Sequence, residues 1–137
     1  MAKKRNEIEV TVAEVVDYLR ITGQFTPVLR EVVTRRITAD AAKKRGIKVT
    51  TTELQKAADS FRAVKDLSKA SDTERWLRSA GISVEVLEEY LETNILISKL
   101  KDSLEKKASK NKYLSTPSIK ASIRDMIYQS WLRDQLK

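Results

Sequence analysis

The chain lacks two residue types on which many catalytic and metal sites depend, since its 137 residues include no cysteine and no histidine. Without cysteine it can form neither a disulfide nor a thiolate ligand, and without histidine no side chain ordinarily titrates near neutral pH. Acid–base catalysis would fall to Asp, Glu, Lys or Tyr, and no run of carboxylates has the spacing of a calcium-binding loop. We therefore expect a protein that is not an enzyme and that uses no metal or other cofactor.

Glycine, proline and long apolar runs are also scarce. Three glycines and two prolines, with 41% hydrophobic and 34% charged residues, are typical of a helical protein with few tight turns. No apolar stretch approaches the roughly 20 residues that a membrane-spanning helix needs. Polar residues interrupt the opening MAKKRNEIEV before the apolar segment of a signal peptide could begin. The sequence predicts a single all-α domain over residues 1–137, with no membrane span and a cytoplasmic location.

Helix-start signals and glycines divide most of the chain into about six helices. Four N-cap positions precede periodic apolar segments: Thr11, Thr50, Ser71 and Ser83, the first three with a glutamate three residues later. A fifth start combines Thr26 as N-cap with Pro27 at the first helical position. The glycines at positions 23, 46 and 81 are expected to end helices, and the helix after Thr50 to fray near Leu67. The longest helix is expected near residues 84–105.

Each predicted helix carries apolar residues at helical spacing, which we expect to be buried. On the first two helices they are Val12, Val15, Val16, Leu19, Val28, Leu29, Val32, Val33, Ile37 and Ala41. On the longest helix they are Leu87, Tyr90, Leu91, Ile95, Leu100 and Leu104, and on the last Ile119, Ile123, Met126, Ile127, Trp131 and Leu132. The apolar face of that last helix, over 117–136, needs a partner surface. Residues 1–10 are expected to be a flexible tail or a short strand, and residues 106–116 a linker.

The net charge of +8 favours contact with polyanions and acidic peptides. Glutamates are interleaved with the basic groups, so we expect most of them to form a solvated surface. The basic residues around the end of the second helix form a candidate basic rim: Arg35, Arg36, Lys43, Lys44 and Arg45. These residues could contact nucleic-acid phosphates, but no helix combines Asn, Gln and Arg at a spacing suited to reading bases. Nucleic-acid binding is therefore an alternative function.

Residues 28–104 resemble the helical chaperone module of SurA, PrsA and related PpiC-type peptidyl-prolyl isomerases. The resemblance is carried by AKKRGIKVT at 42–50, Glu53-Leu54, Trp76-Leu77, Gly81 and the long helix that follows. In that family the catalytic parvulin domain follows the long helix, where this chain has only KKASKNKYLS. The resemblance thus implies a chaperone module without its isomerase domain, in which the last helix, over 117–136, returns onto the N-terminal helices. Because parvulin sites use histidines, prolyl isomerase activity is not expected.

The aromatic and leucine side chains around the longest helix are the candidate site. We expect a groove there that accepts an apolar segment of an unfolded or leader-like polypeptide, lined by Trp76, Leu87, Tyr90, Leu91 and Trp131. The two tryptophans are expected to meet where the last helix docks. The expected function is a non-catalytic, chaperone-like, peptide-binding module. A structural adaptor that forms a homodimer through its C-terminal helix is a further alternative.

Overall fold

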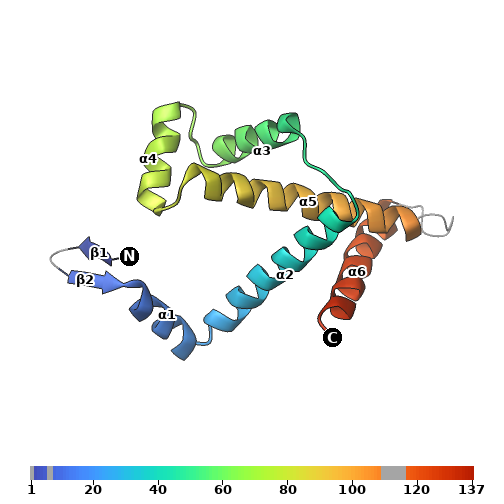
Figure 1. The fold of residues 1–137 in the computed structure, drawn as a ribbon, viewed down its shortest axis with the longest axis horizontal. Helices are drawn as coiled ribbons and strands as arrows, with labels where there is room; N and C mark the ends of the chain where they lie inside the picture. Colours follow the sequence, from blue (N-terminus) through green and yellow to red (C-terminus); the bar gives the residue numbers. More distant parts are fainter. Residues whose placement is uncertain (1, 6–7, 109–116) are drawn as a thin grey trace. The chain divides into compact units, whose positions relative to one another are not determined.

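The computed structural model describes residues 2–5, 8–108 and 117–137, with side chains for 8–107 and 121–137, and this part of the chain is almost entirely helical (Figure 1). It contains six helices: α1 (Val12–Ile21), α2 (Phe25–Lys44), α3 (Thr51–Val64), α4 (Ala70–Ala80), α5 (Val84–Ala108) and α6 (Pro117–Gln135). Two short antiparallel strands, β1 (Ala2–Arg5) and β2 (Ile8–Thr11), precede them. The predicted all-α fold with about six helices is therefore confirmed.

The predicted helix caps form hydrogen bonds at both ends of the helices. The Glu14 backbone N–H donates to Thr11 Oγ1 at 3.2 Å, and at Thr50 both halves of the capping box form, at 2.9 and 3.1 Å. The three glycines adopt φ values between 72° and 78°, a left-handed conformation that a side chain disfavours. After α1, for example, the Gln24 N–H donates to Leu19 O at 2.8 Å, so the turn satisfies a free carbonyl group of the helix end.

Two helix starts differ from the prediction. In the turn after α1, the Gln24 N–H donates to the end of that helix. The α2 helix begins directly after this turn, at Phe25, which is two residues before Pro27. The α4 helix begins at Ala70, not after Ser71, because the Lys69 N–H donates to Asp72 Oδ2 at 3.3 Å. Asp72 therefore replaces the predicted glutamate as the side chain that satisfies the cap.

Two helix ends differ as well. The third helix stops at Val64, where Asp66 adopts φ 56° and the Leu67 N–H donates to Arg62 O at 2.7 Å. An aspartate here does what glycine does at the other ends. Residues 106–108 of the expected linker extend α5, where two lysines complement the negative end of the helix dipole. Its other residues, 109–116, lie outside the described part of the chain.

The chain divides into two compact units, unit 1 (residues 1–35) and unit 2 (residues 36–137). Unit 1 contains the strand pair, whose register runs from Ala2 opposite Thr11 to Arg5 opposite Ile8, followed by α1 and the first part of α2. The expected tail or short strand at residues 1–10 is thus partly strand. None of the described side chains of unit 1, over residues 8–35, is buried.

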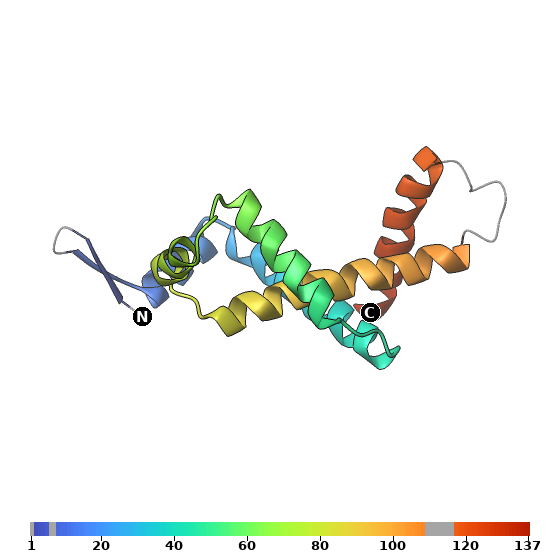
Figure 2. The same ribbon diagram turned by 90° about the horizontal axis from the view of Figure 1, so that it is seen from above.

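Unit 2 is organised around α5, against which α3 and α6 pack (Figure 2). The core combines two small residues of α2 with three leucines of α5: Ala39, Ala42, Leu96, Leu100 and Leu104. Ile127 and Trp131 of α6 pack against this cluster. Leu96 did not belong to the predicted apolar face, and Tyr90 did, yet Leu96 is buried and Tyr90 is exposed.

The last helix packs mainly on α5 and also contacts the second helix, whereas the prediction placed it on the N-terminal helices. The hydroxyl groups of Thr38 in α2 and Tyr128 in α6 lie 2.9 Å apart and form a buried hydrogen bond. Arg124 of α6 pairs with Asp102 and, at 3.1 Å, with Glu105, both in α5. Leu132 of α6 is also buried. Much of the apolar face of α6 is therefore used within unit 2, whereas Met126, which was predicted to be buried, is 66% exposed.

Because Trp131 packs on the core and stacks on Tyr128, Trp131→Ala is expected to lower the free energy of unfolding by about 3 kcal/mol. Urea unfolding followed by circular dichroism measures this change. Met126→Ala on the same helix is the control, since Met126 is 66% exposed and should change stability by less than about 0.5 kcal/mol. Equal effects of the two substitutions would contradict the packing described for α6.

Candidate functional site

Four of the five residues predicted to line a groove are divided between buried positions and two separate aromatic pairs, and the fifth, Tyr90, is 49% exposed. Leu87 and Leu91 are buried, with 8% and 5% of their surfaces exposed, so they offer little surface to a ligand. Trp76 of α4 packs edge-on against Phe61 of α3, at 5.2 Å between ring centroids. Trp131 stacks on its neighbour in α6, and α4 and α6 lie toward opposite ends of α5 (Figures 1 and 2). The expectation that the two tryptophans meet is therefore wrong.

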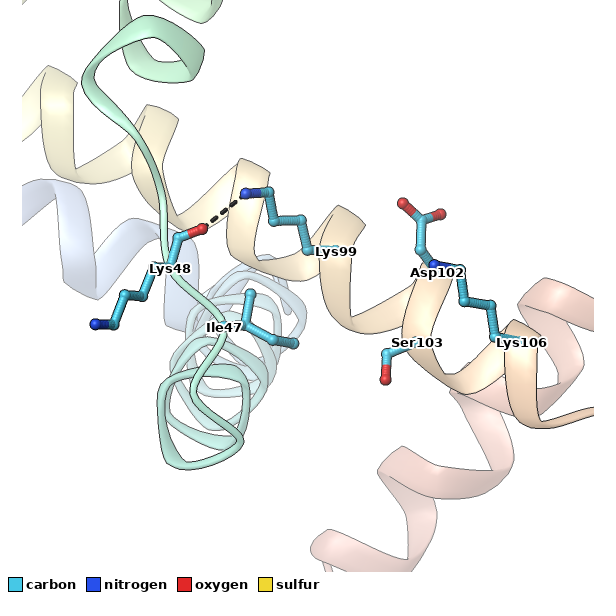
Figure 3. Close-up of a pocket in the computed structure, with 6 residues that line it drawn as sticks. All are labelled: Ile47, Lys48, Lys99, Asp102, Ser103 and Lys106. Atoms are coloured by element: carbon cyan, nitrogen blue, oxygen red, sulfur yellow. Dashed lines mark hydrogen bonds between the residues drawn. The ribbon is translucent and has the colours of Figure 1, made fainter.

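The open pocket beside α5 contains three lysines but does not present them together. It has a volume of about 390 Å³ and is lined by Ile47, Lys48, Lys99, Asp102, Ser103 and Lys106 (Figure 3). The Lys99 ammonium donates to Lys48 O at 2.7 Å and to Glu53 Oε1 at 2.6 Å. The Lys48 side chain extends away from the other lining residues in Figure 3. Lys99 therefore secures the link between α2 and α3 to α5.

Lys99 also determines the ionisation of its partner. Its hydrogen bond, together with the one from the Thr50 backbone N–H, lowers the pKa of Glu53 from 4.5 to about 2. The Glu53 carboxylate thus stays charged in the first turn of α3, where the positive end of the helix dipole also stabilises its negative charge. The pair joins α3 to α5 and has a structural role.

A second pocket, of about 380 Å³, lies between α3, α4 and the start of α5. It is lined by Arg62, Ala70, Thr73, Glu74, Leu77 and Val84. Its charged groups are already engaged, because Arg62 donates to Leu67 O at 3.3 Å and Glu74 pairs with Arg78 at 3.1 Å. What remains is a small, mostly aliphatic surface that could receive one apolar side chain.

Most of the exposed large apolar side chains lie in unit 1, on helix faces that were predicted to be buried. Six branched side chains that helical spacing assigned to buried faces are between 41% and 57% exposed: Val12, Val15, Val28, Leu29, Val32 and Val33. We call these six residues the unit 1 apolar face. The four on α2 are separated by one, three and four positions and therefore share one side of the helix. Further exposed apolar residues of the unit are Ile8, Val10, Tyr18 and Ile21.

The candidate basic rim is partly neutralised. Arg36 pairs with Asp40 at 3.6 Å, and Lys43 pairs with Glu92 of α5 at 3.7 Å. Lys44 and Arg45 are exposed at the end of α2, while Arg35 is half-buried. Exposed pairs of this kind hold their partners weakly. The rim therefore presents a broken row of charges, which suits diffuse attraction better than a specific phosphate site.

The described residues reveal no other chemical centre. Over 2–5, 8–108 and 117–137, no three carboxylates lie close enough together to hold a metal ion, and no described helix is long and apolar enough to cross a membrane. Comparison with family models, with curated proteins and with solved structures finds no match to this chain. The resemblance to the SurA and PpiC-type module therefore stays a prediction that rests on its motifs.

Replacing Lys99 of α5 directly tests its charge pair with Glu53. In Lys99→Met the pKa of Glu53 should rise from about 2 toward its ordinary 4.5, because the strongest hydrogen bond to the carboxylate is lost. Since the folded-state pKa is the lower one, the pair stabilises the fold above pH 4.5, and this stabilisation is lost as the pH falls toward 2. NMR titration of the Glu53 carboxyl group measures the shift.

Lys48→Met is the matched control, because it removes the same charge from the same pocket but leaves the Lys99 contact with Glu53 intact. A Glu53 pKa that stays near 2 in Lys99→Met, or that rises equally in both variants, would contradict the assignment.

Proposed function

We propose that this chain is a non-catalytic polypeptide-binding module that holds apolar segments of unfolded or leader-type polypeptides. The observation that carries the proposal is the unit 1 apolar face. Exposed apolar surface costs roughly 25 cal/mol per Å² relative to its burial, and contiguous patches of this kind mark contact sites on soluble proteins. The proposal moves the contact surface from the groove expected around Leu87 and Trp131 to α1 and α2.

The chemistry of this face suits a broad range of apolar segments. Valine and leucine side chains make hydrophobic contacts but have no hydrogen-bonding groups. They therefore disfavour charged segments of a client but do not require one particular apolar sequence. Valine also has few rotamers to lose on binding. Because the side chains are already exposed, a client needs no opening of the core. An amphipathic segment that lays its apolar side along α2 would bury both surfaces.

The charge of the chain supports the encounter step. A net charge of +8 attracts segments that carry acidic residues beside apolar ones, and this long-range attraction weakens as salt rises. The burial of valine and leucine does not weaken in the same way. The proposal therefore combines salt-sensitive association with a salt-resistant contact.

The resemblance to chaperone modules without an isomerase domain supports the same function, and the lack of cysteine and histidine supports a non-catalytic one. We infer that the module works in a reducing, cytoplasmic compartment, because the chain contains no cysteine.

Fluorescence anisotropy of a labelled, reduced and carboxymethylated lactalbumin tests the proposal at low and moderate salt. We expect saturable binding that persists at moderate salt. The double substitution Val28→Ser and Val32→Ser should weaken it by at least about tenfold, because 1.4 kcal/mol of lost apolar contact has that effect. Serine and valine have similar helix propensities, so α2 should remain folded by circular dichroism.

The matched control is Val64→Ser with Val86→Ser, two exposed valines of unit 2 whose replacement should leave binding unchanged. A labelled DNA duplex is titrated in parallel. No binding of the polypeptide, combined with DNA binding that collapses steeply with salt, would replace this proposal with the nucleic-acid function.

A further inference from the structure

The described side chains of unit 1, over residues 8–35, form no interior of their own. The unit comprises 35 residues, none of its described side chains is buried, and the chain has no cysteine to staple it. Chain segments below about 40 residues usually need disulfides, metals or association with another chain to fold stably. The unit 1 apolar face therefore calls for a covering surface whenever no client is bound.

We infer that two copies of this chain associate through their unit 1 apolar faces. The first reason is that this face complements itself. Two branched-aliphatic surfaces bury each other without leaving a polar group unpaired, and a two-fold contact uses the same patch on both copies. A helix side formed by Val28, Leu29, Val32 and Val33 spans about two turns, enough for two α2 helices to cross on it.

The second reason is charge. Unit 1 contains six Lys and Arg and five Asp and Glu, whereas unit 2 contains 21 and 14, so unit 1 has a net charge of +1 and unit 2 of +7. Two copies can therefore meet through unit 1 with little repulsion, while contact through unit 2 would bring strongly basic surfaces together. The exposed acids Glu14 and Asp17 on α1 and exposed Arg30 on α2 can pair across a two-fold axis.

The contact should be weak and reversible. Six side chains that are about half exposed offer roughly half of the 800 Å² per partner that a standard interface buries. A dissociation constant of the dimer in the micromolar range or weaker suits a face that must also become free to bind a client. Resting on the proposed function, we further expect a client and the second copy to compete for the same surface.

Sedimentation velocity of the whole chain, from micromolar to millimolar concentration, tests the association. We expect a reversible monomer–dimer equilibrium. Val28→Glu with Val32→Glu should abolish it by placing like charges opposite each other, and so should Val28→Lys with Val32→Lys. Mixing these two variants should restore dimers, because opposite charges then face each other. Circular dichroism checks that both variants keep their helices.

Val64→Glu with Val86→Glu is the matched control and should dimerise like the original chain. A chain that stays monomeric throughout, or a dimer that the Val28 and Val32 substitutions leave intact, would overturn the inference. Carboxymethylated lactalbumin is then added to the dimer and should dissociate it. A dimer that binds no polypeptide defeats the proposed function alone, whereas a monomer that binds it defeats the self-association alone.

Discussion

The arrangement of unit 2 depends on how α5 buries its leucines on two different sides. Leu87 and Leu91 are one turn apart on one side of the helix, but the step from Leu91 to Leu96 turns the buried side by about 140° beyond a full turn. From there Leu96, Leu100 and Leu104 continue at four-residue spacing and contact the small residues of α2. Because its buried side changes half-way, one helix can serve as the common surface for several neighbours. The close approach of α2 follows from alanine at positions 39 and 42.

Polar contacts fix the positions of the packed helices of unit 2 relative to one another. The buried bond between Thr38 and Tyr128 satisfies two hydroxyl groups that would otherwise be costly to bury, and it sets where α6 crosses α2. Arg124 with its two carboxylate partners sets the position of α6 along α5. Lys99 does the same for the segment that leads into α3. Each contact joins residues at least 19 positions apart in sequence, so each restricts tertiary structure.

The sequence predicts local structure well because the determinants of helix ends are local. A threonine followed by a glutamate, or a glycine free to adopt positive φ, acts within five residues, and those boundaries are where predicted. Asp66 shows the limit, since aspartate is far more often found in other conformations than the left-handed one it adopts here. The two tryptophans were assigned to one place because apolar periodicity does not reveal which helix a side chain meets. Leu96 was missed because a single periodic stripe was assumed for a helix that has two.

The same distinction explains why the candidate surface could not be read from sequence. Periodicity shows that α1 and the first half of α2 have an apolar side, but whether that side is covered depends on what else the chain can bring to it. In unit 2 the leucines of α5 provide cover, whereas the described side chains of unit 1 provide none for Val28 or Val32. Charge separates in a similar way, since the excess of basic residues belongs to unit 2 and most of the exposed large apolar side chains to unit 1. Under the proposed function, long-range attraction therefore comes mainly from unit 2 and short-range contact from unit 1. Salt should therefore alter how quickly a partner arrives more than how long it stays, because only the first depends on the unscreened charge of unit 2.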